Sequence, residues 1–177
     1  MGLYATTMLT PIGPFTLVCD GDGISAAGFT ERVEDLRMPH RDLGSVKRVP
    51  ELAEHSRALD AYFEGDVSAI DRIPVCQQGS SFHLAAWQAL RQIPSGTPIS
   101  YHELALRLEH PAAARAAGTA CGRNAVALIV PCHRVIRTDG GLGGFAWGLA
   151  RKRWLLDHEA RAVQQIILRK PLSPIYT

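Results

Sequence analysis

The sequence predicts a mixed α/β (α+β) protein in which a strand-containing N-terminal part precedes a mainly helical C-terminal part. Three observations support this prediction: an Asp-Gly turn between two apolar segments near the N-terminus, helical apolar spacing from residue 82 onward, and a change of charge sign between the halves. With 177 residues, the chain is long enough for one domain or two small ones. We expect an N-terminal domain at 1–79, a C-terminal domain at 80–165 and a tail at 166–177.

The charge of the chain is unevenly distributed. Residues 1–81 hold seven Lys or Arg and twelve Asp or Glu, a net charge of −5, whereas residues 82–177 hold twelve and five, a net charge of +7. A basic half beside an acidic half predicts that the C-terminal part meets a polyanion, although charge alone does not identify the polyanion.

Composition places the chain among ordinary globular proteins, with 46% apolar and 20% charged residues. The longest apolar run, 125–130, is far shorter than the roughly 20 residues that cross a bilayer, and no basic segment leads into an apolar one at the N-terminus. We therefore expect a cytoplasmic protein with no membrane partner. The four cysteines are scattered without a C-x-x-C pair, so we expect reduced thiols and no metal site.

The N-terminal part contains sequence patterns that predict its secondary structure. Phe15–Val18 and Ile24–Phe29 are predicted strands of a hairpin, because the turn at 20–23 carries two Asp-Gly pairs that accept positive φ at low cost. Apolar residues at helical spacing predict a helix over 51–64. The segment 66–79 is expected to be an irregular connection.

The C-terminal part begins with helical patterns. From Phe82 the apolar residues share one helix face as far as Ile93, where Pro94-Ser95-Gly96 is expected to stop the helix. Ser100-Tyr101-His102-Glu103 fits a capping box, in which the serine hydroxyl and the glutamate carboxylate each accept from a backbone amide. A short helix reaching Leu108 should follow.

A break at His110-Pro111 separates this helix from a second one. Proline suits the first turn of a helix, so we expect a helix at Ala112–Cys121 that is closed by Gly122. Two short helices separated by a tight break are typical of a helix-turn-helix unit. An ordinary pair of packed helices gives the same pattern, and the pattern alone leaves both open.

The candidate reactive residues follow the apolar run 125–130, which we predict to be a buried strand. The run ends at Pro131-Cys132-His133-Arg134. A lone cysteine is usually a small buried hydrophobe. Neighbouring positive charge and a base favour the reactive thiolate instead, so Cys132 is a candidate nucleophile with His133 as its base. His133 as a purely structural residue is the alternative.

Residues 118–159 carry Gly-Thr-Ala-Cys-Gly-Arg-Asn, Ile-Val-Pro-Cys-His-Arg-Val-Ile, Gly-Gly-Phe-Ala-Trp-Gly-Leu and Lys-Arg-Trp-Leu-Leu-Asp-His-Glu. In these motifs the chain resembles the O6-alkylguanine-DNA alkyltransferases, whose signature Pro-Cys-His-Arg-Val stands here at 131–135. The resemblance is strong over 80–160 and weaker at 10–14 and 61–65. It implies a DNA repair protein with an N-terminal ribonuclease-H-like α/β domain and a C-terminal winged-helix-like domain that contains a helix-turn-helix.

The resemblance also implies roles for single residues. Cys132 would be the nucleophile and alkyl acceptor, His133 would take its proton through a water, and Glu159 would orient His133 and balance its charge. Asn124 would hold the turn beside the site. Tyr101 would assist rotation of the phosphate and donate a proton to the leaving base. No cofactor is implied. Because a thioether has no easy hydrolysis route, each molecule should act once.

The implied partner is double-stranded DNA that contains O6-alkylguanine, and by extension O4-alkylthymine, bound by a monomer. The damaged nucleotide must leave the stack to be reached, and Arg115 on its Ala-rich helix would fill the gap. A solvated arginine gives the same pattern. Further candidates, for phosphate contacts, are Arg91, Arg107, Arg123, Arg137 and the segment 151–153.

Three residues depart from the family pattern in the expected base pocket. Phe145 stands where tyrosine is usual, Ala146 where serine or arginine is common, and Trp147 where many members have glycine. Trp147 either narrows the entrance against bulky adducts or turns outward and stacks on neighbouring groups. Cys121 is interpreted as a packing residue rather than as a second acceptor.

Two other classes of function fit parts of the sequence. A related alkylguanine-binding protein would only mark lesions, but such proteins lack the acceptor thiol that Cys132 supplies. A transcription regulator would read DNA sequence with its helix pair and use Cys132 as a redox or alkyl sensor. Binding to a specific operator would favour the regulator, and binding that depends on damage would oppose it.

Overall fold

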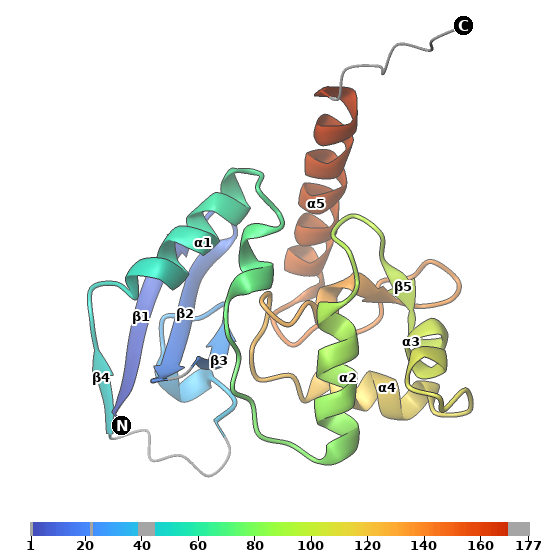
Figure 1. Ribbon diagram of the computed structural model, residues 1–177, viewed down its shortest axis with the longest axis horizontal. Coiled ribbons are helices and arrows are strands. Elements are labelled where there is room, and N and C mark those ends of the chain that lie inside the picture. The colour runs from blue at the N-terminus through green and yellow to red at the C-terminus, as the bar shows by residue number, and fades with distance from the viewer. Residues whose placement is uncertain (1, 22, 39–44, 170–177) are drawn as a thin grey trace, which may run out of the picture.

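The computed structural model, which describes residues 2–21, 23–38 and 45–169, confirms the mixed α/β class (Figure 1). Within these residues a four-stranded sheet forms one side of the molecule, and short helices form the other. The strands are β1 (Leu3–Thr10), β2 (Gly13–Asp20), β3 (Ile24–Gly28) and β4 (Val46–Arg48), in the spatial order β3-β2-β1-β4.

The sheet follows the predicted hairpin and extends it. β2 pairs antiparallel with β3 as expected, and β2 also pairs antiparallel with β1. β4, which no pattern predicted, is parallel to β1. The helix α1 (Ala53–Glu64) packs against the sheet and ends at Gly65, whose φ of 114° lies in the region that favours glycine. Short 3₁₀ turns, η1 (Val33–Asp35) and η3 (Ala69–Arg72), interrupt the connections.

The helical side contains the remaining elements. They are α2 (Ser81–Arg91), β5 (Ile99–Ser100), α3 (Tyr101–Arg107), α4 (Ala114–Gly122), η4 (Cys132–Arg134), β6 (Val135–Ile136) and α5 (Leu149–Arg169). The capping box of Ser100 and Glu103 is present, with Ser100 N donating to Oε2 of Glu103 at 2.6 Å. It fixes the start of α3 and therefore the position of Tyr101. α3 packs on α4, and both contact α2.

Three details of the predicted helix ends are wrong. α2 ends at Arg91, before Ile93, and Gln92 caps it. α4 begins at Ala114 rather than Ala112, because a tight turn in which Ala113 N donates to His110 O occupies the preceding residues. Gly122 does not close α4 in a left-handed conformation. It is the last helical residue, and Arg123 caps the helix with right-handed dihedrals.

The predicted strand at 125–130 is also wrong, because this segment is a buried turn. Val130 N donates to Val126 O within the turn, and Leu128 has a φ of 70°. Only its start pairs with a strand: Ala27 N donates to Ala125 O at 2.8 Å, and Ala127 N donates to Ala27 O at 3.0 Å. An apolar run of six residues has no periodicity that separates a buried turn from a buried strand. The turn is therefore attached to β3, at the edge of the N-terminal sheet.

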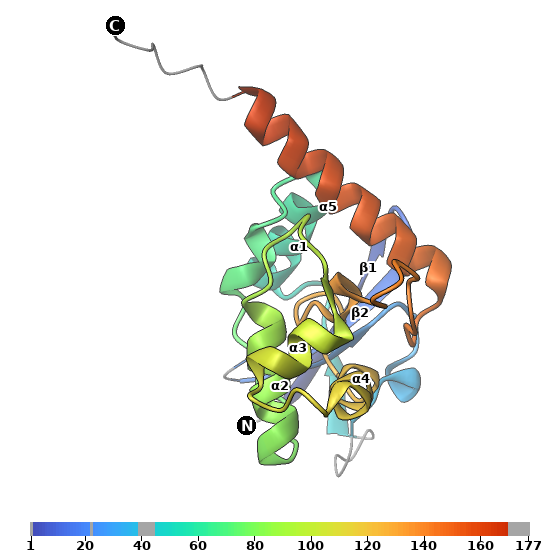
Figure 2. The same ribbon diagram turned by 90° about the vertical axis from the view of Figure 1, so that its right-hand side faces the viewer.

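The long helix α5 runs past both parts of the fold, and its far end projects from the body (Figures 1 and 2). Its buried face carries Lys152, Leu155, Glu159 and Ala162. The helix continues beyond the expected boundary at 165 as far as Arg169, and the rest of the expected tail, 170–177, lies outside the described residues. None of the helices in the described ranges is long and apolar enough to cross a membrane.

Candidate active site

The thiol of Cys132 lies at the start of η4, directly after the buried turn, and the residue is 9% exposed. Asn124 holds it from the other end of that turn. The Nδ2 of Asn124 donates to Val130 O at 2.8 Å and to the Sγ of Cys132 at 3.3 Å, while its Oδ1 accepts from Val126 N at 3.0 Å. One side chain therefore closes the turn and contacts the sulfur.

Lys152 is the second polar group near the thiol, and the sequence analysis missed this role. It is fully buried, and its Nζ donates to Val135 O at 2.6 Å and to Gly144 O at 3.1 Å. Burial raises the pKa of the Cys132 thiol, whereas the Asn124 amide and the Lys152 ammonium act in the opposite direction. The site thus counteracts part of the penalty that burial places on the thiolate.

His133 and Glu159 are both fully buried, and His133 Nε2 lies 2.8 Å from Oε1 of Glu159. Burial opposes ionisation of Glu159, but His133 and Arg134 hold its pKa far below the ordinary value, so the carboxylate is charged. A carboxylate only accepts hydrogen bonds, so Nε2 carries the proton and Nδ1 is the basic atom of the neutral ring. That Nδ1 is buried and has no hydrogen-bond partner among the described residues.

Arg134 anchors this pair. Its Nη2 lies 3.0 Å from Oε1 of Glu159 and donates to Ser95 Oγ at 2.8 Å, and its Nη1 donates to Ile93 O at 2.6 Å. The guanidinium is 1% exposed. The motif at 131–134 therefore places its cysteine on one side of η4 and an ion pair with Glu159 on the other.

A cavity of about 540 Å³ opens above Cys132. Expected site residues in its wall are Tyr101, Asn124, Cys132, Phe145, Ala146 and Trp147, and Cys121 joins them. Burial and the nearby thiols of Cys121 and Cys132 raise the pKa of Tyr101 to about 12. Tyr101 is therefore a protonated donor at neutral pH beside the thiol. The cavity volume lies within the range of about 300–1,000 Å³ that small-molecule sites occupy.

Trp147 borders the cavity, and its ring packs against the N-terminal sheet. A Cβ placed on Gly28 of β3 would collide with the indole ring, so the glycine is what allows this close approach. The Trp147 carbonyl accepts from Arg151 Nη1 at 2.9 Å. Trp147 thus borders the cavity while its ring rests on β3, and a narrowing of the entrance by the indole stays a prediction.

Arg115 is exposed on α4 and lines an open hollow of about 590 Å³ beside the cavity. Tyr101 and Gly118 border both spaces. Arg123 is exposed at the end of α4 but lines a different hollow, together with Arg37 and His83. The structure thus brings Arg115 next to the thiol cavity and does not bring Arg123 there.

Three of the residues considered for phosphate contacts are engaged inside the protein instead. Arg91 Nη2 donates to the carbonyls of Asp71 and Ile73. Arg151 Nε donates to Ile12 O at 2.9 Å, and Lys152 is buried. The geometry does not favour phosphate contacts for these three residues, because their side chains donate to backbone carbonyls of the protein.

Comparison with known proteins identifies the family. The family model described as "6-O-methylguanine DNA methyltransferase, DNA binding domain" matches residues 81–161, and the model described as "6-O-methylguanine DNA methyltransferase, ribonuclease-like domain" matches residues 3–77. The chain belongs to the 6-O-methylguanine DNA methyltransferase family.

Relatives of this methyltransferase family resemble the chain over most of its length. A methylated-DNA–protein-cysteine methyltransferase of Salmonella typhimurium is 40% identical over 163 residues, which cover 89% of this chain and 95% of the relative. The crystal structure of the Mycobacterium tuberculosis O6-methylguanine methyltransferase is 34% identical, with a TM-score of 0.77 and coverage of 97% of this chain and 96% of that one. A structure of the M. tuberculosis protein in complex with DNA has a TM-score of 0.76 at 34% identity, covering 90% of this chain and 94% of that one. The ribonuclease-like and DNA-binding arrangement expected from the sequence is thereby confirmed.

Proposed function

We propose that this chain repairs DNA by taking the alkyl group of O6-alkylguanine onto Cys132. Family membership supports DNA repair by methyl transfer to a protein cysteine, and the observation that selects Cys132 is its position in the wall of the cavity between Asn124 and Tyr101. Cys121 also borders the cavity, but burial raises the pKa of its thiol well above the ordinary value, which disfavours its thiolate.

The transfer begins with removal of the thiol proton. The basic Nδ1 of His133 is the acceptor, reached through a water, and its buried, unpartnered state supports this path. Glu159, whose carboxylate lies against Nε2, stabilises the imidazolium that forms. Lys152 and the Asn124 amide favour the thiolate. These groups together supply a nucleophile that burial alone would suppress.

The thiolate then displaces guanine at the alkyl carbon. A carbon–sulfur bond forms, the bond between carbon and O6 breaks, and its electron pair leaves with the base. The Tyr101 hydroxyl, protonated at neutral pH, donates to the leaving guanine. The product thioether carries a poor leaving group, so the protein is consumed in one event.

The substrate reaches the cavity as a flipped nucleotide, because the alkylated oxygen is inaccessible inside stacked DNA. Arg115 enters the space left in the duplex, which its exposed position beside the cavity supports. Arg123, which lies outside the thiol cavity, contacts the phosphate backbone at a distance from the flipped nucleotide. O4-alkylthymine is a second substrate, since it presents the same alkyl–oxygen bond to the thiolate. The protein acts as a monomer without a cofactor, with the domain division at residues 79 and 80.

Stoichiometry tests this function. Duplex DNA with one O6-methylguanine is incubated with the protein at a tenfold excess of lesion over protein. The amount of repaired DNA per protein molecule is then compared with the gain in mass of the intact chain. We expect one lesion repaired and one methylene gained per molecule, with no further turnover. Binding to the lesion without a mass gain would support a lesion-marking protein instead, and tight binding to one undamaged sequence would support a regulator.

A further inference from the structure

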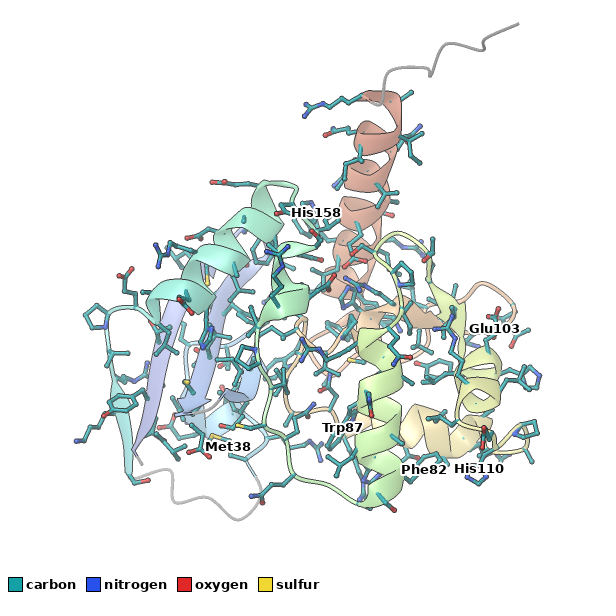
Figure 3. All side chains as sticks on the ribbon, viewed as in Figure 1. Met38, Phe82, Trp87, Glu103, His110 and His158 are labelled. Atoms are coloured by element: carbon teal, nitrogen blue, oxygen red, sulfur yellow. The ribbon has the colours of Figure 1, made fainter. Side chains whose placement is uncertain are left out.

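Tyr62 connects the N-terminal part of the fold to the buried charge cluster behind the thiol. It lies on α1, is fully buried, and its hydroxyl donates to Oε1 of Glu159 at 2.9 Å. Its backbone carbonyl, in turn, lies 2.8 Å from Nε2 of His158. One residue of α1 is thus bonded to two consecutive residues of α5, and Figure 3 shows His158 where the two helices approach each other.

The oxygen that Tyr62 contacts is the same oxygen that His133 contacts. Oε1 of Glu159 has Tyr62 Oη at 2.9 Å, His133 Nε2 at 2.8 Å and Arg134 Nη2 at 3.0 Å. The other oxygen accepts from Arg134 Nε at 3.0 Å and from Gly96 N at 3.4 Å. Donors therefore share the negative charge of Oε1, and each additional donor leaves less charge for His133.

We propose that Tyr62 is a positioning residue of the transfer reaction, which holds Oε1 of Glu159 in place and limits how strongly that oxygen stabilises a protonated His133. The inference rests on the proposed roles of His133 and Glu159. With the phenol donor present, the imidazole stays neutral down to a lower pH than it would beside the carboxylate alone. It can therefore still accept the thiol proton at that lower pH. The N-terminal part of the chain would thereby contribute directly to the reactivity of a site built from the C-terminal part.

The charges around His133 agree with this role. Burial lowers the pKa of His133, Glu159 raises it, and Arg134 and Lys152 lower it further. Burial and the nearby Glu159 raise the pKa of Tyr62 well above its ordinary value, so Tyr62 stays a donor throughout the working range. Asp71 on η3 raises the pKa of Tyr62 too. Two further titratable groups border this cluster: His158, whose ring centroid lies 5.3 Å from that of Tyr62, and the Cys132 thiol, which interacts with Lys152.

The test is the pH dependence of single-turnover methyl transfer to the full chain, measured by intact mass with O6-methylguanine duplex DNA. Tyr62→Phe removes the hydroxyl and keeps the ring. We expect the acid limb of the profile to move upward by about half a pH unit. This lowers the rate about threefold at pH values well below the pKa of His133, while the rate at pH 8 is preserved. Tyr4→Phe, a change on β1 at a residue that is 39% exposed, should leave the profile as it is in the parent.

An unmoved profile would overturn the inference, and so would an equal loss of rate at every pH, because that result indicates a merely structural role. Replacing Tyr62 by 3-fluorotyrosine provides a second arm that keeps the hydroxyl and decides the matter if Tyr62→Phe does not fold. Its stronger donor should move the acid limb downward, and no movement would overturn the inference. If the parent chain itself fails to methylate Cys132, the proposed function fails rather than this inference.

Discussion

Asn124 donates a hydrogen bond to the sulfur of Cys132 at 3.3 Å while the same amide closes the turn that leads to it. The same side chain therefore contributes both to the turn that presents the thiol and to the environment that favours its thiolate. A nearby residue, Gln77, also holds this turn, because its Oε1 accepts from Ala125 N at 2.9 Å. Within the described residues, the sulfur accepts from the Asn124 amide and not from Gln77.

Asn124→Ala should raise the pKa of the Cys132 thiol and slow methyl transfer at pH 7 about tenfold, because one donor to the thiolate is lost. The thiol pKa is followed by the rate of iodoacetamide modification as a function of pH. Gln77→Ala is the matched control: it should lower thermal stability through the same turn without moving the thiol pKa. Equal effects of both variants on the thiol pKa would show that Asn124 acts on the fold alone.

Trp147→Gly should increase the reaction with O6-benzylguanine about tenfold relative to O6-methylguanine DNA, because Trp147 borders the cavity and we expect its indole to limit the width of the entrance. The two rates are compared as a ratio, which cancels a general loss of activity. The variant should also be less stable by about 1–3 kcal/mol, since the ring packs on Gly28. If the ratio stays that of the parent, the indole does not control adduct size.

Arg115→Ala should slow repair in duplex DNA at least tenfold while the reaction with free O6-benzylguanine changes less than twofold, because only the duplex must be opened. Arg123→Ala serves as the control for loss of an exposed positive charge on the same helix. It should weaken DNA binding in a salt-dependent way without changing the ratio of the duplex rate to the free-base rate. If both variants had the same ratio of duplex rate to free-base rate, Arg115 would have no role specific to the opened duplex.

Acid should destabilise the protein through His133 and Glu159. The pKa of each residue is lower in the folded chain than its ordinary value, 6.5 for His133 and 4.5 for Glu159, so the unfolded chain binds more protons as the pH falls. Stability is therefore complete above about pH 6.5 and declines below it, first through His133 and then, below about pH 4.5, through Glu159. Urea unfolding between pH 3 and pH 8 measures this decline.

Glu159→Gln is the variant that separates the two contributions. It should lose about 3–5 kcal/mol of stability at pH 7, because Arg134 is left buried without its partner. It should also lose the part of the pH dependence that lies below about pH 4.5. A variant whose stability still declines there as steeply as the parent would show that other carboxylates dominate acid unfolding.

Local patterns were sufficient for much of the fold. The hairpin of β2 and β3, the capping box at Ser100 and the end of α1 at residue 64 each depend on signals within a few residues, and each is found in the structure, although Asp22 of the hairpin turn lies outside the described residues. The turn at 125–130 was misjudged because six apolar residues carry no period, and its conformation is decided by Asn124 and by pairing with Ala27. β4 was missed because a three-residue strand depends on its partner β1.

The site was predictable only where a motif marked it. The segment at 131–134 and Glu159 were found through their resemblance to a family, whereas Tyr62 lies 97 positions from its partner and has no pattern that connects them. Lys152 could have been found. It shares a helix face with Leu155 and Glu159, and a lysine within an apolar stripe indicates a buried charge with a partner.

The identity of the acceptor atom is the central claim, and peptide mapping after reaction with O6-methylguanine duplex DNA tests it most directly. Proteolysis and tandem mass spectrometry locate the added methylene in the parent chain and in Cys132→Ser and Cys121→Ser. We expect the methylene on Cys132 in the parent and in Cys121→Ser, and none on any residue of Cys132→Ser, which should still bind DNA. Stoichiometric methylation of Cys132→Ser, or a methylene mapped to Cys121 in the parent, would contradict the account.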